Sequence, residues 1–459
     1  MGILSSLTSK EKESIGILQA GTFLEYFDLF LYIHLAALID ACFIPPSEDI
    51  NGNIFFSSFA FCAVFLFRPL GALIFGWIGD HMGRKPTIVM TMFLMSISCL
   101  GIAALPSYAQ GGILVAWVFV ALRAIQGIAS MAEIIGAEVY LTETLKPPVQ
   151  YPIVAFIDVC ASMGSFVALF IITLFTFFGI EKINLFSSFD IESWRMAFFM
   201  GFWIAIIGSF ARTRLRETPN FVDMNYRLKK AQNRGNKDEV DHIKKLSDQG
   251  PVIEKWDRIK SLIIYSALLC AGPTCIYFVY VYSSKFLSTR FGLSFIDIIH
   301  QNLFVSFIQV IVLSIYSYVS YWVYPMKILR LKIVVFSIII VICPFWLDVM
   351  QSPWEFFILQ CLIITFGPNV SPAMPIFLSK FPILHRFSYG MWTYAWSRAF
   401  IYTALAFGVF YLDLWIGYKG WWFIFIPATA AFAIGIWYFE TMKSMPKIPP
   451  ENIAILEPS

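Results

Sequence analysis

Long apolar runs, separated by short polar segments, recur along nearly the whole chain. Each run holds about 20 residues or more, the length that an α-helix needs to cross a bilayer. The pattern therefore predicts an all-α membrane protein with twelve transmembrane helices in two six-helix halves. The predicted helices cover residues 15–42, 53–79, 87–105, 111–142, 151–180, 194–213, 259–285, 295–323, 330–348, 353–379, 386–412 and 420–440.

One long polar segment, residues 214–258, interrupts this pattern. It divides the chain into an N-terminal half (1–213), a linker (214–258) and a C-terminal half with its tail (259–459). The first 14 residues are polar and show no cleavage-site pattern. We therefore expect the first helix to be a retained span and not a removed signal peptide.

Composition supports the membrane assignment, since 58% of the 459 residues are hydrophobic and only 14% are charged. Most of the 33 Lys and Arg residues fall in the even-numbered connections, the terminal segments and the helix ends beside them. The positive-inside rule then places both termini in the cytoplasm of a bacterial inner (plasma) membrane. The net charge of +3 reflects this topology and indicates no nucleic-acid partner. We expect a monomer surrounded by lipid.

Enzymatic chemistry has no support in the residues. The eight cysteines form no C-x-x-C pair and the five histidines show no metal-ligand spacing. The phosphate-loop pattern G-x-x-x-x-G-K-[ST] is absent. The sequence therefore predicts no enzyme, no metal and no cofactor.

Several ionisable residues lie inside predicted helices, where each costs roughly 3 kcal/mol on insertion scales and usually faces the protein interior. Glu25 and Asp28 share one face of the first helix with Tyr32. Arg123 and Arg398 fall at a similar depth near the membrane midplane. Further from the midplane lie Arg68, Glu133 and Asp158.

Two interpretations of these charges remain open. Opposite charges can pair and only join helices, which we favour for Arg68, directly before Pro69. Glu25 and Asp28 exceed what one arginine needs, so here we favour acids that exchange protons during a transport cycle. Arg398 can grip a solute carboxylate through two hydrogen bonds, or it can pair with one of these two acids.

Prolines mark the tenth predicted helix, where Pro368, Pro372 and Pro375 follow one another at spacings of four and three. Each removes a backbone donor, and the freed carbonyls need partners or a water-lined cavity. We therefore expect this helix to bend and to line a cavity.

The segment Gly76–Lys85 (GWIGDHMGRK) follows the second predicted helix. It resembles the G-x-x-x-D-x-x-G-[RK]-[RK] loop of major facilitator superfamily transporters. Further motifs resemble one subgroup, the metabolite:proton symporters that include proline/betaine, 2-oxoglutarate, citrate and shikimate carriers. These motifs are GTFLEYFD at 21–28, FRPLG at 67–71, RAIQG at 123–127 with Glu133, FID at 156–158, WR at 194–195 and RETPNF at 216–221.

The resemblance implies the major facilitator fold and a rocker-switch carrier, with a central cavity that opens to each side in turn. Cytoplasmic contacts that hold the outward-facing state would come from Gly76, Asp80, Gly83, Arg84, Glu143 and Glu217. Together with the charges above, the candidates for proton and substrate coupling are Glu25, Asp28, Tyr32, Arg123, Asp158 and Arg398. Residues 324–330 and 379–382 lack the acids of the family pattern, so we expect an asymmetric gate.

The function we predict is proton-coupled symport of a small carboxylate-bearing metabolite or osmolyte, either proline/betaine-like or an organic acid. An uncoupled facilitator or exchanger would keep the gate charges but need no titrating acid. A membrane sensor that binds a solute without moving it is a third alternative. The sequence names neither the solute nor the direction of transport.

Overall fold

A computed structural model of the chain describes residues 7–43, 59, 61–177, 182–186, 189–213, 226–227, 230, 255–383 and 385–442. Most of the predicted linker lies outside these residues, and so does the tail after residue 442. Nine helical stretches in the described part are long and apolar enough to cross a membrane. Each predicted span overlaps at least one described helix, and two of the spans, 259–285 and 353–379, are interrupted.

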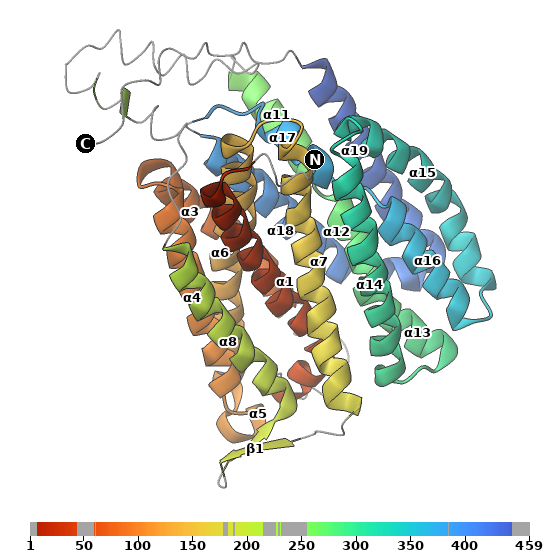
Figure 1. The fold of residues 1–459 in the computed structure, drawn as a ribbon. Coiled ribbons are helices and arrows are strands. Elements are labelled where there is room, and N and C mark those ends of the chain that lie inside the picture. Colours follow the sequence, from red (N-terminus) through yellow and green to blue (C-terminus); the bar gives the residue numbers. More distant parts are fainter. Residues whose placement is uncertain are drawn as a thin grey trace.

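The helices of the N-terminal half follow the predicted order (Figure 1). They are α1 (Ser9–Phe43), α3 (Arg68–His81), α4 (Arg84–Ala104), α5 (Tyr108–Gly111), α6 (Ile113–Thr144), α7 (Gln150–Phe177) and α8 (Ser193–Arg212). A capping box starts α1, because the Thr8 N–H donates to Glu11 Oε2 (2.8 Å) and the Glu11 N–H donates to Thr8 Oγ1 (3.3 Å). An antiparallel hairpin of β1 (Lys182–Phe186) and β2 (Phe189–Glu192) precedes α8, and the apolar pattern did not predict it.

The C-terminal half contains two interrupted helices. The first consists of α11 (Lys255–Leu268), α12 (Ala271–Ile276), the π-helix η2 (Tyr277–Tyr282) and α13 (Ser283–Phe291). The second consists of α16 (Pro353–Phe366), the 3-10 turn η3 (Ser371–Ala373) and α17 (Met374–Leu378). The other elements are α14 (Phe295–Val319), α15 (Pro325–Val349), α18 (Arg386–Ile416), η4 (Gly417–Trp421) and α19 (Trp422–Thr441).

The interruption between α16 and α17 falls where the prolines predict a bend. Its freed polar groups find protein partners: the Ser371 N–H donates to Asn369 Oδ1 (2.9 Å), and the Ser371 hydroxyl donates to the Ala155 carbonyl of α7 (3.3 Å). Lipid offers no such partners, so a broken helix persists at membrane depth only where protein or water supplies them. The break therefore holds this helix against the N-terminal half.

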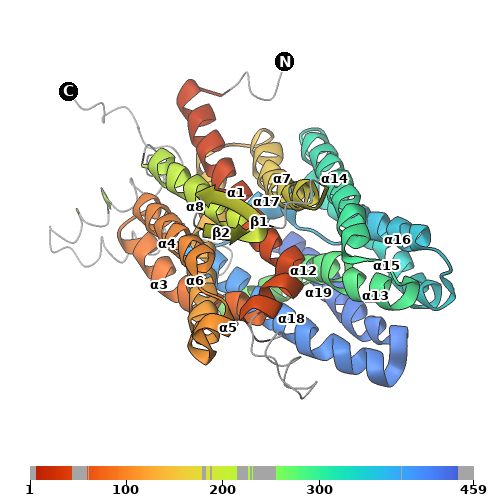
Figure 2. The same cartoon turned by 90° about the horizontal axis from the view of Figure 1, so that it is seen from below.

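The two faces of the molecule are named by what they carry. The face where α1 begins and α19 ends is the termini face, and the opposite face, with β1 and β2, is the hairpin face (Figure 1). Seen from the hairpin face, α1, α3, α4, α6 and α8 form one group, and α12 to α19 form another beside it (Figure 2). α7 lies next to α14, at the boundary between the groups.

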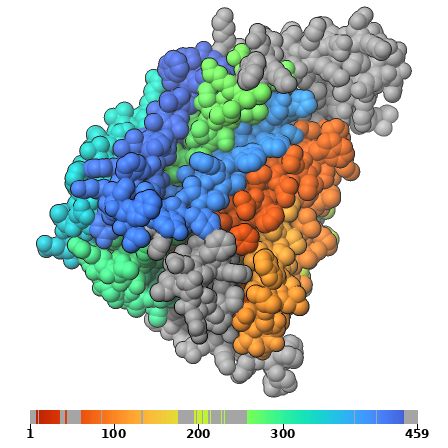
Figure 3. Space-filling view, turned by 180° about the vertical axis from the view of Figure 1, so that it is seen from behind, coloured from red at the N-terminus to blue at the C-terminus, as the bar shows by residue number. Residues whose placement is uncertain are grey.

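The halves meet along two seams. On the first, between α7 and α14, the Phe166 and Phe307 rings are 5.7 Å apart and the Ser317 hydroxyl donates to the Pro152 carbonyl (2.8 Å). On the second, α18 lies against α3 and α6, and Figure 3 shows blue α18 between green α11 and orange-red α3. Each seam therefore pairs helices of different halves.

Glycine makes the second seam close. A Cβ on Gly79 would lie 2.4 Å from Cε1 of Phe387, and one on Gly76 would lie 3.1 Å from the Ser388 hydroxyl. Contacts under 3.0 Å force one partner to move. The two glycines thus let α3 approach α18 more closely than any side chain would permit.

Gly79→Val should lower the free energy of unfolding by about 1–3 kcal/mol, because its side chain overpacks the seam against Phe387. Thermal or denaturant unfolding in detergent measures the change. Gly408→Val in α18 is the control, since no atom lies within 4 Å of a Cβ built there. Equal stability of the two variants would contradict tight packing of α3 on α18.

Candidate functional site

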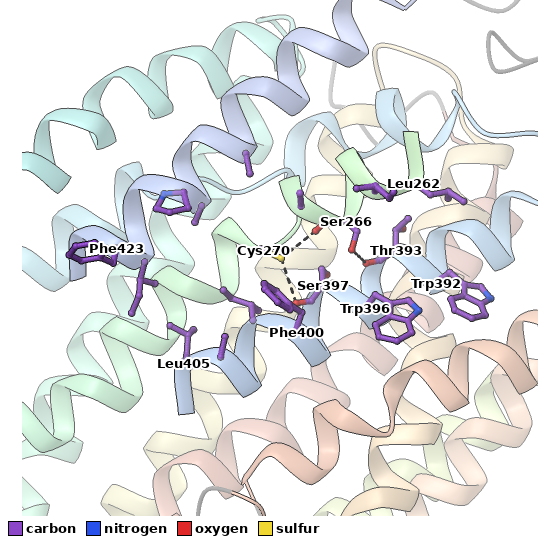
Figure 4. Close-up of a pocket in the computed structure, with 18 of the residues that line it drawn as sticks. Leu262, Ser266, Cys270, Trp392, Thr393, Trp396, Ser397, Phe400, Leu405 and Phe423 are labelled. Carbon is purple, nitrogen blue, oxygen red and sulfur yellow. Dashed lines mark hydrogen bonds between the residues drawn. The ribbon is translucent and has the colours of Figure 1, made fainter. Parts of the chain in front are cut away.

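A large hollow among the described residues, about 920 Å³, is an apolar groove on the outside of the C-terminal half between α11, α18 and α19 (Figure 4). Trp396 and Phe400 stand exposed along it. Its polar groups are bonded within the half, as where the Ser266 hydroxyl donates to the Thr393 carbonyl (3.2 Å). The groove therefore belongs to the surface that faces lipid chains.

A smaller cavity, about 90 Å³, lies between the two halves. By this measure one water needs roughly 10–15 Å³, so the cavity holds several waters or a small solute. Tyr26 and Asp158 line it from the N-terminal half, and Lys332, Asn369 and Arg398 line it from the C-terminal half. An acid from one half and two cations from the other make this cavity the candidate solute site.

Asp158 joins the halves at the cavity. It projects from α7, and its Oδ2 accepts a hydrogen bond from Asn369 Nδ2 (3.0 Å). Asn369 lies in the interruption between α16 and α17. At this break its side-chain amide binds Asp158 of the other half. The carboxylate is thus held by the half to which it does not belong.

The two cations of the cavity come from α15 and α18. Lys332 is 3% exposed, and its Nζ lies 4.8 Å from the Tyr316 ring centroid. The Arg398 guanidinium donates from Nη1 to the Leu269 carbonyl (2.7 Å) and lies 4.2 Å from the Tyr394 ring centroid. Such cation–π contacts contribute about 0.5–2 kcal/mol each. The cavity lining therefore contains two cations and one carboxylate, an excess of one positive charge.

The acids of α1 lie in a separate cluster inside the N-terminal half. Glu25 Oε1 is 3.7 Å from Arg68 Nη2, and both side chains are about 2% exposed or less. Asp28 Oδ1 accepts from the Cys99 thiol (3.2 Å). The space among these residues is about 10 Å³, so the cluster has no room for a solute in this conformation.

Arg123 completes this N-terminal cluster. Its Nη1 donates to Gln126 Oε1 (2.6 Å), and its guanidinium carbon lies 3.7 Å from the Tyr32 ring centroid. Among the predicted site residues, the structure therefore brings Glu25, Asp28, Tyr32, Arg68 and Arg123 together. It places Asp158 and Arg398 in the cavity instead.

Tyr394 connects the cluster with the cavity. Its hydroxyl is 3.3 Å from the Tyr26 hydroxyl across the halves. Its ring lies 5.9 Å from the Arg68 guanidinium carbon and 4.2 Å from that of Arg398. A movement of α18 against α1 would thus change contacts both in the N-terminal cluster and in the cavity.

Contacts at the termini face close the cavity on that side. Arg386 Nη1 of α18 lies 3.5 Å from Glu143 Oε1 of α6. The Ser388 hydroxyl of α18 donates to Asp80 Oδ2 of α3. Gly83, the N-cap of α4, has φ of 110°, a conformation that favours glycine. This turn fixes Asp80 beside the seam.

Aromatic contacts between the halves lie on the side of the cavity towards the hairpin face. The Phe65 and Tyr402 rings stack 3.9 Å apart. Phe30 of α1 meets Tyr280 of η2 edge-on at 5.3 Å. Contacts between the halves therefore lie on both sides of the cavity in this conformation.

Three predicted residues are not placed by the structure. Glu217 lies outside the described residues, and the side chains of Arg84 and Glu133 are outside the described part as well. Two buried residues were missed by the sequence analysis. Lys332 lies close to the predicted start of its helix and Glu138 close to the predicted end of another, so neither counted as a charge at membrane depth.

The chain has known relatives. A sequence profile of the Major Facilitator Superfamily matches residues 20–402. A Staphylococcus aureus protein, named as a candidate proline/betaine transporter, is 31% identical over 212 residues, 46% of this chain and 44% of that protein. The proline/betaine transporter of Salmonella typhimurium is 28% identical over 281 residues, 61% of this chain and 53% of that protein. The chain spans about half the length of the curated relatives that it matches.

Solved structures share the fold. The proton:xylose symporter XylE matches with a TM-score of 0.74, covering 95% of this chain and 98% of that chain, at 13% identity. The human organic anion transporter MFSD10 matches with a TM-score of 0.65, covering 94% and 100%, at 14% identity. At these identities the likeness concerns the fold alone. It confirms the predicted major facilitator fold.

Glu25→Gln should destabilise the protein by about 3 kcal/mol, because it leaves the buried Arg68 guanidinium without its carboxylate. Denaturant unfolding in detergent gives the change in the free energy of unfolding. Glu13→Gln, at an exposed position of α1, should change it by less than about 0.5 kcal/mol. If Glu25→Gln is equally mild, the pair does not hold α1 to α3.

Proposed function

The chain belongs to the major facilitator superfamily, and from that premise we propose that this transporter carries a small carboxylate-bearing metabolite or osmolyte by proton-coupled symport. The main support for this proposal is the cavity between the halves, with Asp158 on one side and Lys332 and Arg398 on the other. A charged space between the two halves suits a solute that enters from one face and leaves through the other.

The charges favour the solute class. A carboxylate can accept two parallel hydrogen bonds from the Arg398 guanidinium and a third from the Lys332 ammonium. In a zwitterionic solute, the positively charged group would then face Asp158. The solutes in the names of the relatives, proline and betaine, carry both charges.

Alternating access would use the contacts between the halves. We propose that residues 1–213 and 259–459 move as units joined by the linker, with the termini face in the cytoplasm of a bacterial plasma membrane. The contacts Glu143–Arg386 and Asp80–Ser388 would break whenever the termini face opens. Gly76, Gly83, Arg84 and Glu217 would complete this gate. Glu25 and Asp28 remain the predicted proton-coupling acids.

Uptake into proteoliposomes tests the proposal. Radiolabelled L-proline, glycine betaine and 2-oxoglutarate are offered with and without an imposed pH gradient, and protein-free liposomes give the background. Accumulation that needs the gradient supports symport. Uptake that only equilibrates supports a facilitator or exchanger, and binding without uptake supports a sensor.

Arg398→Lys should weaken solute affinity roughly 10- to 100-fold, because lysine cannot reproduce the planar fork that binds a carboxylate. Competition binding in detergent measures the change. Arg195→Lys is the control: Arg195 donates to the Ala103 carbonyl (3.3 Å), away from the cavity. Unchanged affinity in Arg398→Lys would remove the reason to prefer carboxylate-bearing solutes.

Asp80→Asn should slow transport roughly tenfold while solute binding persists, because a hydrogen bond to a charged group contributes about 1.5–3 kcal/mol to the closed termini face. Initial uptake rates and binding are compared in the same preparation. Asp297→Asn, in the exposed capping box that begins α14, should transport normally. A normal rate in Asp80→Asn would argue against its role in the gate.

A further inference from the structure

One buried acid between the halves has no part in the function proposed so far. Glu138 lies in α6 and is 7% exposed. Its Oε2 is buried and has no hydrogen-bond partner among the described residues. A carboxylate oxygen in that position loses the hydration of its charge without compensation, whereas a protonated carboxyl group loses far less.

Groups from four elements act electrostatically on Glu138. They are Asp158 from α7, Arg398 from α18, Glu25 from α1 and Tyr265 from α11. The one cation among them, Arg398, is already directed to the Leu269 carbonyl and faces Asp158. An ionised Glu138 would therefore share the Arg398 guanidinium with Asp158. This competition again favours the protonated, neutral carboxyl group of Glu138.

Its place in α6 ties Glu138 to the closure of the termini face. A Cβ on Gly390 of α18 would lie 3.0 Å from Ile135 and 4.0 Å from Val139, so this stretch of α6 packs against the opposite half. Glu143, which pairs with Arg386, follows five residues later, roughly 7–8 Å along the helix. Separation of that pair would loosen the packing beside this stretch of α6.

We propose that Glu138 is a proton-binding site of the carrier, neutral while the halves are closed at the termini face and ionised when they separate there. On opening, the O–H bond of the carboxyl group breaks, the proton passes to water at that face, and water solvates the carboxylate. Closure requires the reverse step. Acid conditions therefore favour the closed termini face, and this preference is lost as the pH rises. The inference rests on the alternating access proposed above.

Infrared spectroscopy of the purified full-length protein tests the proton without any solute. The spectrum at neutral pH should contain the carbonyl stretch of a protonated carboxylic acid that is lost in Glu138→Gln. Glu138→Asp should keep a shifted band, and Glu13→Gln, at an exposed position, should leave the band unchanged. An identical carboxylic-acid region in wild type and Glu138→Gln would overturn the proposal.

Fluorescence energy transfer between dyes on non-natural amino acids at Lys146 and Ser379 tests the coupling to closure. Both positions are exposed at the termini face, one in each half. In wild type the dyes should move apart as the pH rises, whereas in Glu138→Gln they should stay close at every pH. An equal response to pH in both proteins would overturn the link between Glu138 and closure.

Proteoliposome assays separate this inference from the proposed function. Glu138→Gln should slow both gradient-driven accumulation and counterflow exchange, because each cycle must open the termini face, which the permanently neutral side chain keeps closed. If wild type carries none of the three labelled solutes, the proposed function fails, while the infrared result still decides whether Glu138 binds the proton. If Glu138→Gln accumulates solute as wild type does, the inference fails although transport is established.

Discussion

The cost of burying charge in a membrane protein governs this structure. Roughly 3 kcal/mol opposes each charged side chain at membrane depth on insertion scales, so each must find a partner in the protein or water in a cavity. The chain meets this requirement in two ways. Glu25 and Arg68 are paired within one half, whereas Asp158 is bonded by Asn369 of the other half.

The two arrangements have different consequences for movement. A pair within one half survives when the halves separate, so the cluster around Glu25 and Arg123 stabilises the N-terminal half as a unit. A contact between the halves is lost on separation, and its groups then need water or a solute. The cavity charges are of this second kind, which is why they are the better candidates for binding a solute that enters between the halves.

Interrupted helices and glycines make these contacts possible. The break between α16 and α17 brings Asn369 to Asp158, because its backbone no longer runs as an intact helix. Gly79 lets α3 lie against Phe387 of α18, which closes the termini face below the cavity. Both features lie where the two halves meet. The present arrangement of the halves therefore depends on a few local contacts, such as Asn369 with Asp158 and Gly79 with Phe387.

The sequence by itself determined the membrane class, the order of the helices, the bend at the prolines and the family. These follow from local signals: apolar length, proline positions and short ordered motifs. It also identified most buried charges, but it could not say which of them meet, because Asp158 and Asn369 are far apart in the chain. Lys332 and Glu138 were missed because errors of a few residues at helix ends decide whether a charge counts as buried. Only the tertiary structure separates the N-terminal cluster from the cavity, since packing between distant helices sets which charges share a space.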